Sequence, residues 1–185
     1  YRLTDPLIAR AIKGEPASGL VTMSHSELRK ESEELAERAF IALEDTPHAR
    51  PRLKTVEKRG MVMCAAVPVT VGPRLVGVLH GGMLLNRNFD LVDYLEDAIY
   101  KDAEYDGKQV GTVTVFLHDA RIATTVRTED GNRAIGTRVS KEVADQVLDN
   151  ARPWFDRAFV VNDWYLSAYD PIRDAGGRVI GMLYV

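Results

Sequence analysis

The sequence has 185 residues, of which 45% are hydrophobic and 28% are charged, and its formal net charge is −3. These values are typical of a soluble globular protein with room for one domain or two small ones. They argue against a nucleic-acid-binding protein, which normally carries a clustered basic surface, and Cys64 alone excludes an internal disulfide. No apolar run approaches the roughly 20 residues that cross a membrane. Because the chain starts at Tyr1 without Met and stops within an apolar strand pattern, we expect it to be part of a longer protein.

Three segments of the first half have helical patterns. Asp5 and Pro6 predict a helix start, because Pro is favoured in the first turn, and Ser24 and Glu27 have the spacing of a capping box that opens a helix to about residue 40. The third segment, residues 89–100, has its apolar residues on one side. A loop is predicted over residues 44–60, and strands are predicted over residues 61–71 and 74–85. Cys64 lies in the first of these strands, so we expect a buried thiol that reacts slowly.

The second half contains five predicted strands and one helix. Two strands, residues 111–117 and 121–126, precede a polar loop over residues 127–138 and a helix that begins after Ser140. Three further strands, rich in aromatic and β-branched residues, cover residues 157–185. This order predicts an α+β fold in which helices cover one face of an antiparallel sheet. We expect residues 111–185 to form one sheet of about five strands.

Two segments of the sequence resemble each other. Ala66-Val-Pro, followed by Arg74-Leu-Val-Gly-Val-Leu, is similar to Ala168-Tyr-Asp-Pro, followed by Arg178-Val-Ile-Gly-Met-Leu. The two arginines are 178 − 74 = 104 residues apart, the length of a small module. We therefore predict two tandem modules, residues 1–105 and residues 106–185, joined at the charged segment 101–108. The first copy has no counterpart of the strands at 111–126, so its opening strands lie before Tyr1 or are missing.

The sequence lacks the residue constellations that are typical of enzymes. The four histidines do not have metal-ligand spacing, no Ser lies in a nucleophile elbow, and no glycine-rich loop has the spacing that holds phosphates. We therefore expect no catalysis and no metal or other cofactor.

Polar side chains gather on one face of the predicted second sheet. Alternation places Thr124 on the inward face of its strand, and it places Tyr165, Ser167 and Tyr169 together on one face of the middle strand of the last three. Arg133 and Thr137 come from the loop that we expect to cross the open side of the sheet, and Arg157 begins a strand. An arginine surrounded by hydroxyls suits a small carboxylate, because the guanidinium binds the anion through two hydrogen bonds.

These seven residues form the predicted ligand site, and its ligand is a small organic anion. Arg133 is the stronger candidate of the two arginines, because it lies in the covering loop. We expect Arg133→Ala to weaken the binding of an acetate- or pyruvate-class anion by about 1.5–3 kcal/mol. The alternative is that each arginine only extends into water and that the tyrosine hydroxyls lie at a solvated rim of the sheet.

The second half also resembles a known family. The runs that carry the resemblance are Gly111-Thr-Val-Thr-Val-Phe, Gly131-Asn-Arg-Ala-Ile-Gly-Thr, Arg157-Ala-Phe-Val-Val-Asn-Asp-Trp-Tyr-Leu and Gly177-Arg-Val-Ile-Gly-Met-Leu-Tyr-Val. They are similar to the fused double Cache module, a PAS-like sensor of bacterial chemoreceptors and sensor histidine kinases. The similarity is dense over residues 111–185 and looser over residues 5–86.

The resemblance implies a ligand-sensing region on the periplasmic side of the inner membrane, anchored by segments outside this sequence and paired as a homodimer in the full receptor. It also implies that Ser167 and Tyr169, four and two positions before Pro171, line the ligand pocket. The same offsets from Pro68 give Cys64 and Ala66, which cannot hold an anion, so the second module is expected to bind the ligand. A cytosolic PAS-type regulatory domain and a spacer without a ligand remain alternatives.

Overall fold

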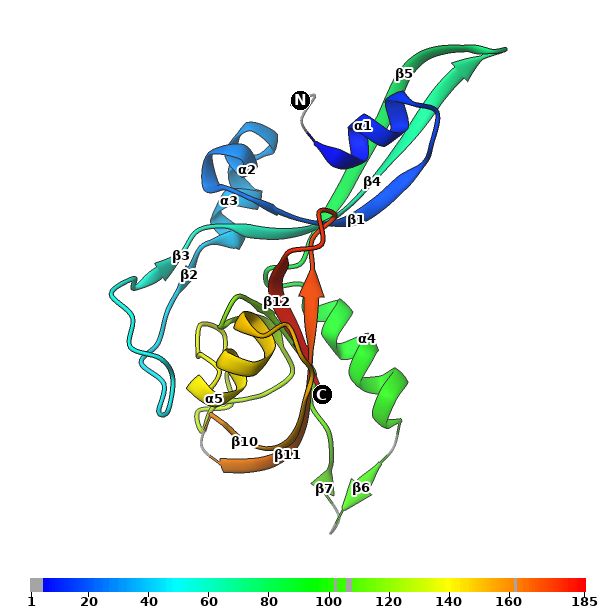
Figure 1. Cartoon of the computed structure of the whole chain (residues 1–185). Helices are drawn as coiled ribbons and strands as arrows, with labels where there is room; N and C mark the ends of the chain where they lie inside the picture. Colours follow the sequence, from blue (N-terminus) through cyan, green and yellow to red (C-terminus); the bar gives the residue numbers. More distant parts are fainter. Residues whose placement is uncertain (1–4, 102, 106–107, 162) are drawn as a thin grey trace.

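The structure is a computed structural model that describes residues 5–101, 103–105, 108–161 and 163–185. It contains one antiparallel sheet of three strands and one of five strands, and Figure 1 shows the first above the second. Helices pack against both sheets. The chain therefore has the predicted α+β fold, built on antiparallel sheets.

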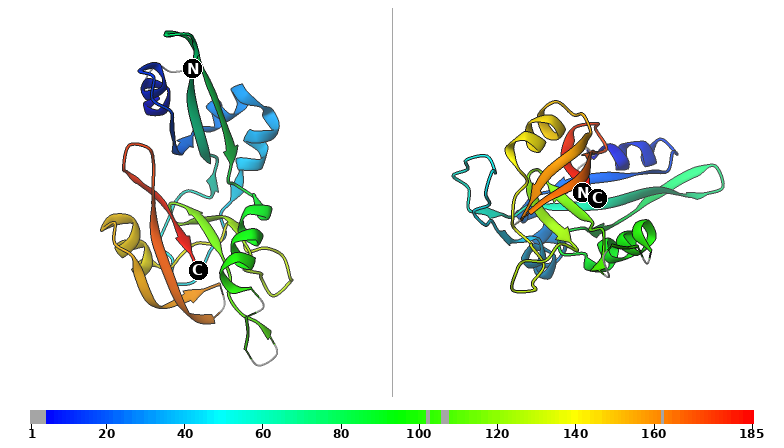
Figure 2. Two further views of the ribbon diagram at one scale, coloured as in Figure 1. Left: turned by 90° about the vertical axis from the view of Figure 1, so that its right-hand side faces the viewer. Right: turned by 90° about the horizontal axis from the view of Figure 1, so that it is seen from below.

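The three-stranded sheet has the order β1-β4-β5 and is covered on one face by short helices. Its strands are β1 (Ala17–Met23), β4 (Gly60–Val71) and β5 (Arg74–Leu84), and the helices are α1 (Pro6–Ile12), α2 (His25–Glu31) and α3 (Glu33–Ala39). Strands β4 and β5 form a long hairpin that projects from the rest of the molecule, with α1 along one of its faces (Figures 1 and 2). The sequence predicted both strands of this hairpin.

The helix starts of the first half follow the predicted caps. The Asp5 carboxylate accepts hydrogen bonds from the backbone amides of Leu7 and Ile8, and Ser24 and Glu27 form the predicted capping box. The single helix predicted up to residue 40 is wrong, because Ser32 has an extended backbone (φ −165°, ψ 140°) that ends α2 and begins α3.

The five-stranded sheet has the order β10-β11-β12-β8-β9, and every neighbouring pair is antiparallel. Its strands are β8 (Thr114–Leu117), β9 (Ala120–Thr124), β10 (Trp154–Val160), β11 (Asp163–Arg173) and β12 (Val179–Tyr184). This confirms the single sheet predicted for residues 111–185. Two short pairs complete the strands: β2 (Ile41–Ala42) with β3 (Val56–Glu57), and β6 (Glu104–Tyr105) with β7 (Lys108–Gln109).

Helices cover both faces of the five-stranded sheet, so the prediction of helices on one face is wrong here. On one face lie α5 (Lys141–Ala144) and the π-helical turn η1 (Asp145–Asp149) that continues it, and on the other lies α4 (Phe89–Tyr100). The core on the α5 side includes Phe116, Val143, Val147, Tyr169 and Met182. The core on the α4 side includes Val92, Val113, Val115, Ile122 and Ile180. The sequence assigned α4 to the first module, which hid its contact with this sheet.

The two halves of the chain pack as a unit. Ile41, Met61 and Leu85 of the first half belong to the same core as the α4 side of the five-stranded sheet. The β11–β12 turn also reaches the three-stranded sheet, where the Ala175 amide donates to the Leu20 carbonyl at 2.9 Å. The division at residues 105 and 106 stays a prediction, and part of the predicted junction (residues 102 and 106–107) lies outside the described residues.

Cys64 lies under the helices of the first half and is 4% exposed. Its strand is apolar on both faces, as predicted, although only the Cys64 face is covered. Burial, together with the carboxylates of Asp5 and Glu31, raises the pKa of the thiol to about 11. Because the thiolate is the reactive form, we expect a thiol reagent to label the native protein slowly at neutral pH and rapidly in urea. Rapid stoichiometric labelling without urea would contradict this placement.

Candidate functional site

Arg121 is the largest side chain that the structure buries completely, with 1% exposure. It lies in β9 with its guanidinium 5.1 Å from the centre of the Phe116 ring, and its Nη1 donates to the Thr137 hydroxyl at 2.6 Å. Within the described residues, its Nε has no hydrogen-bond partner and no carboxylate lies at ion-pair distance. A buried charge normally has a partner, because removing it from water is costly. Arg121 is therefore a buried cation without a carboxylate partner among the described residues.

A β-bulge explains why Arg121 points inward. The pairing of β8 with β9 shifts between Val115 and Phe116, so Val115 faces Ala123 while Phe116 faces Arg121. One extra residue in a strand reverses the alternation beyond it. Arg121 and Thr124 consequently share the α5 side of the sheet, whereas Ile122 belongs to the core on the α4 side.

Hydroxyl groups from four strands accompany Arg121 on the α5 side. Thr124 and Thr114 are both fully buried and hydrogen-bond to each other across β8 and β9. Tyr169 of β11 is fully buried too, and its hydroxyl has no hydrogen-bond partner within the described residues. The Tyr169 ring lies 4.9 Å from the ring of Tyr184 in β12. Two unpartnered polar groups, the Arg121 Nε and the Tyr169 hydroxyl, therefore lie in one small region.

The electrostatics of this region favour an anion. Burial raises the pKa of Tyr169 well above its usual value, although the charge of Arg121 acts in the opposite direction. Burial lowers the pKa of Arg121, and both Tyr169 and Tyr184 oppose that change. An arginine stays protonated even when its pKa falls from so high a value. At neutral pH the site consequently presents a guanidinium and a neutral phenol, both of which donate hydrogen bonds. Among the described residues, no cluster suits a metal ion.

The helix over residues 141–149 closes the site from the α5 side. Val143, Ala144 and Val147 belong to the core between this helix and the sheet, and Leu148 packs beside them. Ser140 occupies the predicted N-cap position but makes no side-chain cap bond. From the outside, Arg50 binds the carboxylates of Asp145 and Asp149. The second half of this helix has π geometry, which occurs frequently at functional sites.

A comparison with known families identifies the part of the chain that contains the five-stranded sheet. Residues 83–185, more than half of the chain, match the family single Cache domain 3. The chain belongs to this family. Cache domains are sensory modules that bind ligands, typically outside the cytoplasm, and they are not catalysts. No curated protein matches the chain.

The match covers one Cache module, so the predicted fused double Cache is not confirmed. It begins at Met83 and takes in α4, which the sequence placed in the first module. A second copy over residues 1–105 stays a prediction. In the described part of the chain, no helix is both long enough and apolar enough to span a membrane.

Four of the seven predicted site residues lie buried on the same side of the five-stranded sheet as Arg121. Thr124, Thr137, Ser167 and Tyr169 are all buried. Ser167 and Tyr169 share one face of β11 with Tyr165, because alternate residues of a strand point the same way. Tyr165 lies nearer the end of the strand and is 45% exposed. The structure therefore places Tyr165 at the rim of this region.

Arg157 and Arg133 are not brought into this region. Ala158 of β10 faces the core on the α5 side, so its neighbour Arg157 is exposed on the opposite face. Arg133 forms two hydrogen bonds with Asp93 of α4, at 2.7 and 2.8 Å, and lies 4.6 Å from the centre of the Phe89 ring.

The course of the loop over residues 127–138 explains the position of Arg133. The loop was expected to cross the open face of the sheet, but it hydrogen-bonds along the free edge of β9 instead. Backbone bonds join Arg121 to Gly136 and to Thr137, and the Arg133 side chain donates to the Thr124 carbonyl. At this edge Thr137 points toward Arg121, whereas Arg133 points toward α4. The charge of Arg133 is thereby already compensated.

Arg121 is the site residue that the sequence reasoning missed. Strict alternation from Thr124 on the inward face places Arg121, three residues away, on the outward face. The signal that could have revealed it is local: Arg121 is a charged residue with Ala120 before it and Ile122 and Ala123 after it in a short strand. A charged side chain in such a strand is either exposed to water at the edge of the sheet or buried with a polar or charged partner.

Proposed function

We propose that this chain is the extracytoplasmic sensing region of a bacterial transmembrane receptor, either a chemoreceptor or a sensor histidine kinase. Its Cache module binds a small organic anion, such as a short carboxylate, between the five-stranded sheet and the helix over residues 141–149. Membership of the Cache family supports a sensory role. The single observation that carries the choice of ligand is the buried, uncompensated guanidinium of Arg121.

The charge balance of the module favours a ligand with one negative charge. Arg133 is paired with Asp93, and Arg138 is paired with Asp119 at 2.6 Å. Arg121, by contrast, is buried and has no carboxylate partner among the described residues. The surrounding core is apolar, with Val143, Val147 and Met182 among its members. A monocarboxylate with a short apolar part matches this combination, because a second carboxylate would be buried without a partner.

A route for the signal leads from the site to the last strand. A carboxylate held by Arg121 and Tyr169 contacts a phenol whose ring packs on Tyr184. Tyr184 lies in β12, and its hydroxyl accepts a hydrogen bond from Thr112 at 3.0 Å. Ligand binding would shift the population between two arrangements of these side chains, and β12 would transmit that bias.

The repeated hairpins support a further part of this proposal, that residues 1–105 are a first, incomplete Cache copy. In both hairpins a proline lies in the first strand and an arginine lies at the start of the second: Pro68 in β4 with Arg74 as the first residue of β5, and Pro171 in β11 with Arg178 directly before β12. The first sheet has three strands where the second has five.

Titration with small charged compounds tests the proposed function. We expect at least one short monocarboxylate, such as acetate, propionate or pyruvate, to raise the melting temperature saturably, because a ligand that binds the native state stabilises it. Calorimetry should then give one site per chain. Succinate should bind more weakly, and a cationic amine of similar size should not bind. Binding of amines but not of carboxylates, or no binding by any of these compounds, would contradict the proposal and favour a cationic ligand or a spacer.

A further inference from the structure

The residues beneath the helix over residues 141–149 are closed off from solvent. Arg121, Thr124 and Tyr169 are each at most 1% exposed. A ligand can therefore reach them only when part of the surrounding structure moves. The sheet is the more rigid side, because backbone hydrogen bonds join its strands to one another. The helix packs on the site through apolar side chains, such as Val143 and Val147, and a short segment held in this way opens at lower cost.

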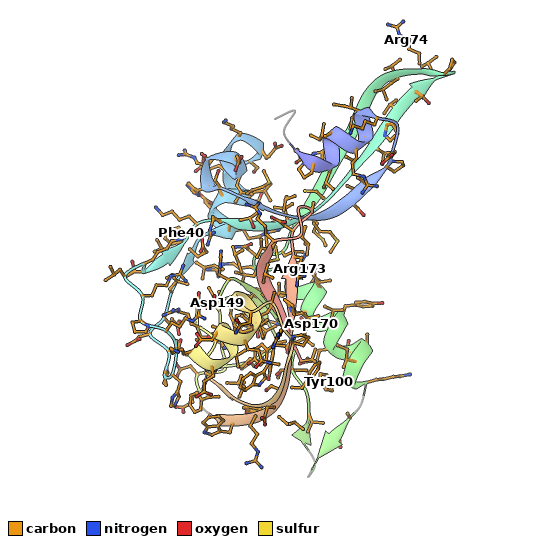
Figure 3. All side chains as sticks on the ribbon, viewed as in Figure 1. Phe40, Arg74, Tyr100, Asp149, Asp170 and Arg173 are labelled. Carbon is orange, nitrogen blue, oxygen red and sulfur yellow. The ribbon has the colours of Figure 1, made fainter. Side chains whose placement is uncertain are left out.

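An arginine of the first half holds this helix from the outside. Arg50 lies in the loop between β2 and β3 (residues 43–55), which Figure 1 shows beside α5. Its Nε donates to the Asp145 carboxylate at 2.8 Å, and its terminal nitrogens donate to Asp145 and Asp149. These two carboxylates belong to the first and last residues of η1, and Asp149 is labelled in Figure 3. A single guanidinium thus bridges both ends of the π-helical turn.

The loop that carries Arg50 is itself fixed to the Cache module. Before Arg50, the Thr46 hydroxyl accepts a hydrogen bond from the Arg138 amide at 2.9 Å, and both residues are buried. After Arg50, the Arg52 side chain pairs with Asp119 at 2.7 Å. Because the loop is attached on both sides of Arg50, the guanidinium holds the helix from a fixed position.

We propose that Arg50 is a latch, which keeps the helix over residues 141–149 closed on the site and so sets the rates at which the anion enters and leaves. The proposal rests on the proposed function, because the anion beside Arg121 is the ligand whose exchange the latch controls. Bonds that form only in the closed arrangement shift the population toward it. Since Arg50 belongs to the first half, a displacement of its loop alters ligand exchange in the Cache module.

Hydrogen exchange of the ligand-free chain tests the latch without any ligand. Arg50→Ala should speed amide exchange over residues 144–149 by about 3- to 10-fold, the effect of losing two partly exposed ion pairs, and should leave β8 and β12 unchanged. Lys141→Ala is the matched control, because Lys141 binds the same Asp145 at 2.6 Å but belongs to the helix and does not tie it to the loop. Asp149→Asn should give part of the Arg50→Ala effect and add little to it in the double variant, since both residues act through one contact.

Ligand kinetics give the second readout, with acetate, propionate or pyruvate as the probe. In Arg50→Ala the association and dissociation rate constants should both rise about 3- to 10-fold, as the amide exchange does. The Kd should change by less than about twofold, because Arg50 stabilises the closed helix with and without the anion and does not contact the ligand. A purely structural role would not raise both rate constants at constant affinity.

The outcomes separate the latch from the proposed function. Faster exchange confined to the helix, with both rate constants raised and Lys141→Ala unchanged, supports the proposal. Unchanged exchange over residues 144–149 in Arg50→Ala overturns it, and so does an equal increase in every strand, which would make Arg50 a support of the whole fold. Binding that persists with unaltered rates also overturns the latch and leaves the proposed function intact. If none of the three carboxylates binds, the proposed function fails, and the role of Arg50 in ligand exchange fails with it.

Discussion

Replacing Arg121 by methionine should abolish most of the anion affinity of the Cache module and, at the same time, stabilise the ligand-free protein. In the proposed site the guanidinium supplies the charge-assisted hydrogen bonds to the anion, so its loss should weaken binding about 10- to 100-fold. The same guanidinium is buried without a carboxylate among the described residues, so its removal ends a desolvation cost. We expect the free energy of unfolding without ligand to rise by about 1–3 kcal/mol. Calorimetry and urea denaturation measure the two effects.

Two other arginines serve as controls for Arg121→Met. Arg157→Met changes an exposed residue on the opposite face of the sheet and should alter neither quantity by more than about 0.5 kcal/mol. Arg133→Ala removes the partly exposed pair with Asp93, so it should lower stability by about 1 kcal/mol and leave affinity nearly unchanged. Unchanged affinity in Arg121→Met would contradict the proposed site. A loss of about 1.5–3 kcal/mol of binding free energy in Arg133→Ala would instead place the anion beside Arg133, at the edge of β9.

A residue that is costly for stability and useful for binding is expected at a functional site. The same combination separates a ligand site from a structural ion pair. Glu57 and Asp119 are held by arginines at 2.8 and 2.6 Å, and each pair is internally compensated. Arg121 has hydroxyls and aromatic rings around it instead. The chain thus contains buried charges that are paired with an opposite charge, such as Glu57 and Asp119, and one, Arg121, that is surrounded by hydroxyls and rings. The type of partner distinguishes a structural ion pair from a candidate ligand site.

The sequence predicted the regular parts of the Cache module. The three strands predicted over residues 157–185 and the helix predicted after Ser140 have clear periods, and both are present in the structure, where the first of the three strands begins earlier, at Trp154. The shared face of Ser167 and Tyr169 was predicted for the same reason, because they lie two residues apart in a strand without a bulge before Ile172. Where one period holds over a whole element, the inward residues can be read from the sequence.

The predictions for Arg121, Arg133 and the helix around Ser32 differ from the structure because the backbone is irregular or depends on distant contacts at these positions. The bulge beside Phe116 turned Arg121 inward, and no local pattern fixes where a strand gains a residue. Arg133 was misplaced because the path of its loop depends on hydrogen bonds to the free edge of β9, which are contacts between distant residues. The break at Ser32 interrupts a segment whose composition is strongly helical. In each case tertiary packing overrides the local signal.

Glu57 should give the other large effect, on stability and on its pH dependence. Its side chain is completely buried between β3 and the following turn, and it accepts hydrogen bonds from the Arg59 guanidinium, from Lys54 and from two backbone amides. Burial alone would raise the pKa of Glu57, but the bonds from the Arg59 side chain and backbone outweigh burial and lower the pKa to about 2. The ionised carboxylate therefore stabilises the folded state.

The sign of the pH dependence follows from this depressed pKa. The ordinary value is 4.5, so the stabilisation is fully present above about pH 5 and is lost as the pH falls toward 2. The difference between the two pKa values corresponds to about 3 kcal/mol at neutral pH. We expect Glu57→Gln to lower the free energy of unfolding by this amount at pH 7, and the gap to the wild type should shrink by about half between pH 5 and pH 3.

Urea denaturation at several pH values between about 3 and 7 measures the Glu57 effect directly. Glu33→Gln is the matched control, because Glu33 pairs with Arg29 on the exposed side of α2 and α3, where both side chains are 57% exposed. Such a pair contributes about 0.5 kcal/mol or less. A stability gap for Glu57→Gln that stays constant from pH 7 to pH 3 would show that the charge of Glu57 is not what holds residues 52–59 together. A gap that closes on acidification, with Glu33→Gln unchanged, would identify the Glu57 carboxylate as the anchor of the loop that leads from the three helices of the first half into β4.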